Sequence, residues 1–169
     1  MRRLLDTLYD GCAALAALAM VALLASVLLS VAGRQLGFNI PGIDSYAGFL
    51  LAASGFLSLA HTLKRGEHIR VTLLLNSLSP GPKRALELWT LLAGALLAGL
   101  FAFYSAKLAW QSHEFNDVST GTDATPLWIP QLSMAVGAAV LLIALIDELV
   151  LELRGQRVVP TSDEAMHNE

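Results

Sequence analysis

Four stretches of this sequence contain no Asp, Glu, Lys or Arg, and they constrain the fold more than any other feature. They cover residues 11–33, 45–63, 88–106 and 124–146, which are 23, 19, 19 and 23 residues long. As helices that rise about 1.5 Å per residue they would be roughly 28 to 35 Å long, and the hydrocarbon core of a bilayer is about 30 Å thick. We therefore predict an all-α integral membrane protein with four transmembrane helices, which form one membrane domain over residues 1–154.

The composition excludes several other classes of protein. Hydrophobic residues make up 55% of the chain and charged residues 15%, which is too little charge to cover the surface of a soluble domain. The net charge is −3, and no basic patch lies outside the segments that flank the spans, so nucleic-acid binding is not expected. Only about half of the residues lie outside the spans, and they are divided among five separate segments. We therefore expect no soluble catalytic domain, no catalytic residues and no enzymatic activity.

The first span has some features of a signal peptide. Arg2 and Arg3 precede the apolar run, which ends in the small-x-small sequence Ser30-Val31-Ala32. The run of 23 residues is longer than the usual h-region of about 7 to 15, and Asp6 and Asp10 are unusual in a positively charged leader. We therefore expect this segment to be retained as a membrane span.

The distribution of Lys and Arg predicts the orientation of the chain. The N-terminus, the segment 64–87 and the C-terminal tail together carry nine of these residues, and the segments 34–44 and 107–123 carry two. Because positively charged segments resist translocation, both termini and the 64–87 segment are expected in the cytoplasm. Aromatic residues that favour the headgroup layer fit this frame, with Tyr9 and Trp89 at inner ends and Tyr46, Trp110 and Trp128 at outer ends.

Polar residues beside prolines mark two helix starts. Ser79 precedes Pro80-Gly81-Pro82 and is expected to cap the third helix, and Thr125 before Pro126 is expected to cap the fourth. Pro130 lies close enough to the start of the fourth helix to cost little hydrogen bonding.

Small residues recur at spacings of three or four along three of the spans. Such faces permit close helix packing in a bilayer, against the other helices of the chain or against another subunit, and periodicity alone does not choose between these. A bulky stripe of Leu92, Leu96, Leu100 and Phe103 opposes the small face of the third span. The predicted packing residues are Ala19, Ala22, Ser26 and Ser30 on the first span, Gly48, Ala52 and Gly55 on the second, and Ala95, Gly99 and Ala102 on the third.

The spans lack the residues that carry out transport chemistry in membranes. No ionisable residue and no central proline lies near a midplane, where substrate and ion sites are usual. The hydroxyls of Ser26, Ser54 and Ser58 can be satisfied by their own helices. His61 and His68 are seven residues apart, about 10 Å along a helix, which is too far to chelate one metal. The single cysteine, Cys12, has no intrachain partner and is read as a small residue in a helix. No metal or cofactor is therefore expected.

The segment after the second span carries a family resemblance. The sequence His61-Thr62-Leu63-Lys64-Arg65-Gly66-Glu67-His68-Ile69-Arg70-Val71 resembles the signature of the small permease subunit of TRAP (tripartite ATP-independent periplasmic) transporters, the DctQ family. The further matching positions are Arg34, Asp44, Trp128 and Pro130, and the motif positions outside the second span are Gly66, Glu67, His68 and Arg70. The chain departs from the family where tryptophan and glutamate are common and it has Ile43-Asp44-Ser45-Tyr46.

The resemblance implies a role in secondary active transport in the bacterial inner membrane. In such systems a periplasmic substrate-binding protein captures an organic acid, a large multi-span permease subunit moves it inward, and the small subunit is a fixed scaffold that does not bind substrate. The implied partners are the large subunit, the periplasmic protein transiently, and membrane lipids. The alternative, from another class, is a membrane anchor subunit of a redox complex.

The motif positions and the tail also lead to predictions of local structure. Arg34 and Asp44 either pair across the outer hairpin or leave Arg34 to reach lipid phosphate, and the sequence leaves both open. Gly66 is expected to leave the second helix in a left-handed conformation. Residues 69–78 are expected to form a short interfacial helix in which Arg70 meets anionic lipid or the partner. The tail 155–169 is expected to be disordered.

Overall fold

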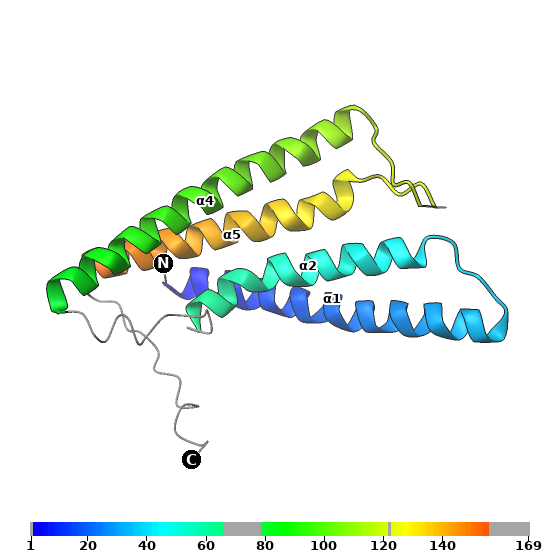
Figure 1. Ribbon diagram of the computed structural model, residues 1–169, viewed down its shortest axis with the longest axis horizontal. Coiled ribbons are helices and arrows are strands. Elements are labelled where there is room, and N and C mark those ends of the chain that lie inside the picture. The colour runs from blue at the N-terminus through cyan, green and yellow to red at the C-terminus, as the bar shows by residue number, and fades with distance from the viewer. Residues whose placement is uncertain (1, 66–78, 122, 156–169) are drawn as a thin grey trace, which may run out of the picture.

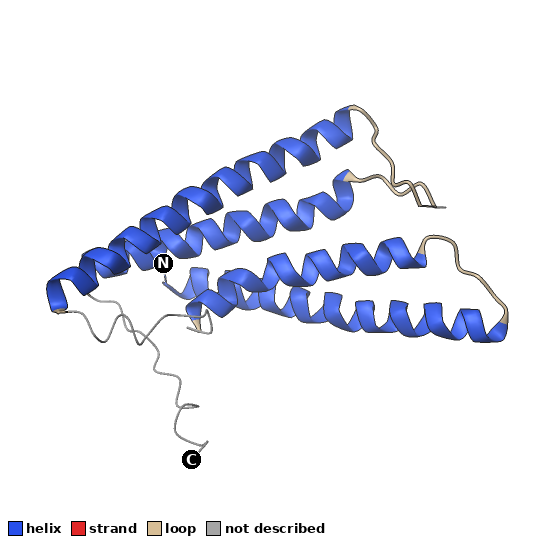
Figure 2. Ribbon diagram, in the orientation of Figure 1, coloured by secondary structure: helices blue, strands red, loops and turns tan. Residues whose placement is uncertain are grey.

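The structure of the chain is a computed structural model that describes residues 2–65, 79–121 and 123–155. It contains four long helices, α1 (Arg2–Leu36), α2 (Ile43–Lys64), α4 (Pro80–Glu114) and α5 (Trp128–Leu153). Figure 2 shows that these helices account for nearly all of the ordered secondary structure in the described residues. Each of them is long and apolar enough to cross a membrane, which confirms the prediction of an all-helical protein with four candidate spans.

Two of the helices extend well beyond the charge-free stretches that predicted them. α1 and α4 each contain 35 residues, and α2 and α5 contain 22 and 26. At about 1.5 Å per residue the two long helices measure about 50 Å, more than the thickness of the hydrocarbon core. The segments 2–10, 80–87 and 107–114, expected outside the spans, are therefore helical. No helix breaker separates these segments from the apolar stretches that they adjoin. Their charged residues therefore continue the helix past the expected membrane boundary.

The helices are arranged as two antiparallel hairpins that meet through their second members. α1 packs against α2, and α5 packs against both α2 and α4, so α2 and α5 are the inner helices and α1 and α4 the outer ones. Figure 1 shows that α1 and α4 begin, and α2 and α5 end, at one end of the molecule. We call this the termini end, and we call the opposite end, with the two hairpin connections, the loop end.

Small side chains form the contacts within each hairpin. On α1, Cys12, Ala16 and Ala19 are buried at spacings of three and four, as the small face predicted. On α4, every seventh residue is buried, which is the repeat of helices that pack side by side with a left-handed twist. These residues are Leu91, Ala98, Ser105 and Ser112. The opposing stripe is exposed, with Leu96 at 62% and Phe103 at 64%.

The two hairpins approach each other closely at Gly137. A Cβ atom at this position of α5 would lie 2.5 Å from the backbone oxygen of Phe56 on α2 and 2.6 Å from its carbonyl carbon. Because backbone atoms cannot turn away as a flexible side chain can, only glycine fits at this crossing. Nearby on α5, Ala138 and Ala144 are almost fully buried, so the inner helices approach each other through small residues.

Of the two predicted helix caps, one residue lies at the expected position and the other does not. α4 begins at Pro80 with Ser79 in the N-cap position, as expected, but the Ser79 side chain accepts no capping hydrogen bond. α5 begins at Trp128 with Leu127 in the N-cap position, so the prediction that Thr125 caps this helix is wrong. The Thr125 hydroxyl instead donates a charge-assisted hydrogen bond to the carboxylate of Asp123 within its own loop.

Candidate functional site

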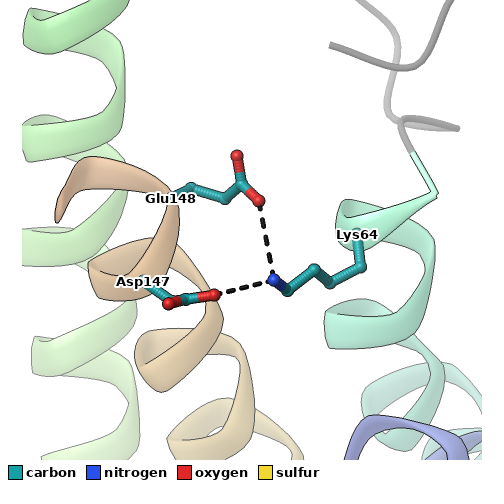
Figure 3. Close-up of polar contacts among 3 residues, drawn as sticks. All are labelled: Lys64, Asp147 and Glu148. Carbon is teal, nitrogen blue, oxygen red and sulfur yellow. Dashed lines mark hydrogen bonds and ion pairs between the residues drawn. The ribbon is translucent and has the colours of Figure 1, made fainter. Parts of the chain in front are cut away.

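The termini end contains an ion pair that joins the two hairpins. Lys64 is the last residue of α2, and its Nζ atom lies 2.7 Å from Asp147 Oδ2 and 3.9 Å from Glu148 Oε1 on α5. Figure 3 shows the lysine side chain reaching across from α2 to the two carboxylates. The exposed fractions of the Lys64 and Asp147 side chains are 23% and 19%, so the pair is shielded from most of the solvent. A charge left alone here would be costly, which makes the pair a specific link between the hairpins.

A buried tyrosine lies beneath this lysine. Tyr9 on α1 is 2% exposed, and Lys64 Nζ lies 5.5 Å from the centre of its ring, within the range of a cation–π contact. Tyr9 packs in one core with Cys12, Ala60, Val140 and Ala144, from three helices. The sequence predicted Tyr9 as an aromatic residue at the inner end of its span, and the structure packs its ring against the neighbouring helices. Its ring fills the space where α1, α2 and α5 converge, and burial of the ring outweighs exposure of the hydroxyl.

A cleft of about 320 Å³ opens beside this core. One wall comes from α1 and the other from the end of α2, where His61 Nδ1 lies 3.4 Å from Asp10 Oδ1 across the cleft. The lining residues are Asp6, Tyr9, Asp10, His61, Lys64 and Arg65. Charges of both signs therefore surround one small space at the termini end.

At the loop end, the α4–α5 connection folds back onto the start of α2 (Figure 1). We call this contact the loop-end clasp; it consists of Gly42, Ser45, Tyr46, Gly121, Asp123 and Thr125. Gly42 has a left-handed backbone with φ of 78°, and a Cβ atom there would lie 2.6 Å from Asp123 Cγ. A Cβ atom at Gly121 would lie 2.7 Å from Ser45 Oγ. Two glycines thus allow the two loops to touch.

Hydroxyl groups fix the carboxylate at the centre of the loop-end clasp. Thr125 Oγ1 donates to Asp123 Oδ2, and the hydroxyl oxygen of Tyr46 lies 3.1 Å from the same Thr125 atom. The hydrogen bonds from Thr125, then Tyr46, lower the pKa of Asp123 below its usual value of 3.8, since they stabilise the charged form.

A second pocket, of about 340 Å³, lies between α1 and α2 at the loop end. Arg34 and Asp44 both line it, but Ser30 Oγ donates to Asp44 Oδ1 at 2.9 Å, and no ion pair joins Arg34 to Asp44 in the described part of the chain. The reading in which these two residues pair across the hairpin is therefore wrong. Ser30, which the sequence assigned to helix packing, holds the carboxylate.

The remaining predicted positions at the loop end lie at the start of α5. Trp128 is the first residue of α5, and its ring contacts His113 edge-on at a centroid distance of 5.3 Å. This contact ties the first turn of α5 to the last turn of α4. Pro130 is the third residue of α5, where no hydrogen bond within the helix is lost, as expected.

The small residues predicted on the spans divide into two groups. Ala19 is buried between α1 and α2, and a Cβ atom at Gly99 would make ordinary contact with Leu142 at 3.7 Å. Gly48 and Gly55 of α2 are different, because a Cβ atom at either position would meet nothing within 4 Å. The partly buried members of the predicted set are Ala22, Ser26, Ser30, Ala52, Ala95 and Ala102. The glycine-containing face of α2 is thus left open by the fold.

The hydroxyls within the spans bond to their own helices, as expected. Ser26 Oγ donates to the carbonyl of Ala22 at 2.8 Å, and Ser54 and Ser58 donate to the carbonyls three residues before them, each at 2.9 Å. Cys12 is buried as a free thiol, in keeping with its reading as a small residue in a helix. His61 and His113 lie at opposite ends of the molecule, so these two residues do not share one ligand. Several predicted positions lie outside the described residues: Gly66, Glu67, His68 and Arg70, the interfacial helix at 69–78, and the tail from residue 156.

Three contacts between the hairpins were missed by the sequence reasoning: the Lys64–Asp147 pair, the loop-end clasp around Asp123, and the Gly137 crossing. A signal existed for the first, because Lys64 and Asp147 each follow directly on the end of a charge-free stretch at the same face of the membrane. Gly137 lies four residues after Ser133 and seven before Ala144 on α5, a set of small residues that the sequence prediction did not include. The loop-end clasp had no comparable signal, since no periodicity relates the two loops.

The comparison with protein families adds an independent finding. The family described as "Tripartite ATP-independent periplasmic transporters, DctQ component" matches residues 23–155, which include α2, α4, α5 and about half of the apolar part of α1. No curated protein matches the chain.

Proposed function

Since the chain belongs to the DctQ family of TRAP transporter components, we propose that it is the scaffold subunit of a secondary transporter that imports organic acids. In this proposal the four helices form a rigid body that stabilises the large multi-span subunit and does not itself bind substrate. A periplasmic substrate-binding protein meets the assembled transporter transiently. The chain carries out no catalysis.

One observation carries the proposal: the charged side chains of the described helices lie towards the two ends, and polar contacts at both ends tie the hairpins together. Lys64 bonds to Asp147 at the termini end, and Thr125 of the α4–α5 connection bonds to Tyr46 of α2 at the loop end. The charge-free stretches between these ends supply no ionisable group to bind a substrate carboxylate or to relay an ion. Polar contacts in this protein therefore serve rigidity.

The open face of α2 is the proposed contact with the large subunit. Gly48 and Gly55 are exposed, and a Cβ atom at either position would contact no other element of the described structure within 4 Å. In a bilayer, small residues allow another helix to approach closely and gain van der Waals contact, whereas lipid tails gain little from the same surface. Ala52 lies between the two glycines at helical spacing and continues this face.

The orientation proposed is the one that the Lys and Arg distribution favours, with the termini end in the cytoplasm of a bacterium and the loop end in the periplasm. Reporter fusions after Gly37, Ser79 and Thr120 test it. A periplasmic signal at Gly37 and Thr120 with a cytoplasmic signal at Ser79 supports the proposal. A cytoplasmic signal at Gly37 or Thr120 contradicts it.

Co-purification tests the scaffold function itself. The tagged chain, extracted in mild detergent from cells that express the neighbouring genes, is expected to bring down a large hydrophobic subunit in a fixed ratio. Gly55→Leu is expected to reduce that recovery strongly, because the added side chain fills the open face. Ala17→Leu, at an exposed position of α1, is the matched control and should leave recovery unchanged. A chain that purifies alone, or equal recovery with both variants, would count against the proposal.

A further inference from the structure

The cleft at the termini end is lined by charged residues, and most of them already have partners within the chain. Lys64 is bound to Asp147, and His61 faces Asp10 across the cleft. Among the described residues, Asp6 and Arg65 make no ion pair and no side-chain hydrogen bond, so the cleft is left with one available carboxylate and one available guanidinium group.

Two further atoms of the cleft also lack full partners. Tyr9 lines the cleft, and its hydroxyl oxygen is buried with no hydrogen-bond partner in the described part of the chain, although a buried hydroxyl normally has one. Asp10 is 73% exposed, and only one of its oxygens faces His61, at 3.4 Å. The cleft thus offers acceptors from Asp6 and Asp10, and donors from Arg65 and Tyr9.

The depth of the cleft places these groups in the headgroup layer of a membrane. Asp10 directly precedes the first charge-free stretch, and Lys64 and Arg65 directly follow the second. The headgroup layer on each side of the hydrocarbon core is about 5 to 7 Å thick, close to one helical turn. Tyr9, Asp10, His61, Lys64 and Arg65 all lie within about one turn of the boundary, and Asp6 lies one turn further out.

We propose that this cleft binds the headgroup of a zwitterionic phospholipid that carries a primary ammonium group, with Arg65 and Tyr9 donating to the phosphate and Asp6 and Asp10 accepting from the ammonium. A net-neutral headgroup with both charges matches the free cation and the free carboxylate that the described residues leave in the cleft. An anionic headgroup without an ammonium leaves Asp6 unpaired and places a further negative charge beside Asp10. A trimethylated ammonium has no N–H to donate, so the carboxylates distinguish the two zwitterionic headgroups by hydrogen bonding.

Thermal unfolding of the purified full chain in detergent tests the proposal. Phosphatidylethanolamine, phosphatidylcholine and phosphatidylglycerol with identical acyl chains are added at the same mole fractions, and the midpoint of unfolding is followed. A ligand that binds only the folded state raises this midpoint with concentration. Phosphatidylethanolamine is expected to reach the same shift at about one fifth of the concentration of phosphatidylcholine, as the added charge-assisted hydrogen bonds imply. Soluble glycerophosphoethanolamine and inorganic phosphate separate a lipid from a free phosphate source and are expected to produce no shift.

Two variants and their controls assign the effect to the cleft. Asp6→Asn is expected to make the response to phosphatidylethanolamine equal to that of phosphatidylcholine, and Arg65→Gln to weaken the response to both. Asp117→Asn and Arg154→Gln change exposed residues of the same types elsewhere and should retain the wild-type preference. Arg65→Gln stands as an independent test if Asp6→Asn lowers stability by itself.

Equal responses of the wild-type chain to the three lipids would overturn the proposal, as would a preference that survives in Asp6→Asn or a response that is undiminished in Arg65→Gln. A shift produced by soluble glycerophosphoethanolamine alone would also overturn it, because the ligand would then not be a lipid. None of these outcomes bears on recovery of the large subunit, so the cleft and the scaffold function fail or succeed separately.

Discussion

The two ends of the seam between α2 and α5 are joined by different kinds of contact. At the termini end, a half-buried ion pair links Lys64 to Asp147 directly from helix to helix. At the loop end, the link runs through the loop-end clasp, in which hydroxyls hold Asp123 and glycines allow the loops to touch. Between them Gly137 packs closely against the backbone of Phe56, a contact made by shape and not by polar groups. The seam is therefore specified by packing in the middle and by polar groups at its ends, and each part should respond to a different perturbation.

The largest effect is expected at the middle of the seam. Gly137→Ala places a Cβ atom against the Phe56 backbone and forces the hairpins apart, which should lower the free energy of unfolding by about 3 kcal/mol, as in overpacked cores. Gly48→Ala makes the same change in open space and is the control; it should leave stability unchanged or slightly raise it. Unfolding in detergent followed by circular dichroism measures both. Equal stabilities of the two variants would show that the crossing at Gly137 is not tight.

The next effect is expected at the termini end. Lys64→Met leaves Asp147 without its cation in a partly shielded position, and the free energy of unfolding should fall by about 1 to 3 kcal/mol. A double-mutant cycle with Asp147→Asn measures the coupling, and the double variant should recover part of the loss. Lys107→Met, at an exposed position on α4, is the control. Additive single and double losses would mean that the pair contributes nothing specific.

A smaller, pH-dependent effect is expected in the loop-end clasp. Because folding lowers the pKa of Asp123, the folded state binds this proton less tightly than the unfolded chain does, so the stabilisation is present above the unfolded value of 3.8. It is lost as the pH falls from there through the lower pKa of the folded state. The midpoint of unfolding should therefore drop between about pH 5 and pH 3 by more in the wild type than in Asp123→Asn. Parallel curves for the two proteins would contradict the assignment.

The smallest effect is expected for the contact between Asp10 and His61. The distance of 3.4 Å and the 73% exposure of Asp10 leave this pair largely screened by solvent. Asp10→Asn should lower the free energy of unfolding by less than about 1 kcal/mol. A loss as large as that of Lys64→Met would reverse the ranking of the two contacts at the termini end.

The sequence predicted the number and positions of the helices because the absence of charge over a bilayer thickness has one simple structural solution. It also predicted the buried face of α1, since small residues at helical spacing favour close packing. It did not predict how far α1 and α4 extend, because charged residues are good helix formers outside the membrane as well. Nor did it predict the contacts of Lys64, Asp123 or Gly137, which depend on how one hairpin lies against the other. The burial of the Tyr9 ring was not predicted for the same reason, since it depends on α5 as well as on the helix that carries Tyr9.

A disulfide across the loop-end clasp tests most directly whether the four helices stay fixed while the transporter works. A Cβ atom at Gly121 lies within 2.7 Å of Ser45 Oγ, which puts paired cysteines at Ser45 and Gly121 within disulfide reach. The substitutions Ser45→Cys and Gly121→Cys are made together in a Cys12→Ala background, and substrate uptake by the complete transporter is measured before and after oxidation. The account predicts that uptake does not change when the link forms. A loss of uptake on oxidation that a reductant restores, absent from the single-cysteine variants, would contradict it.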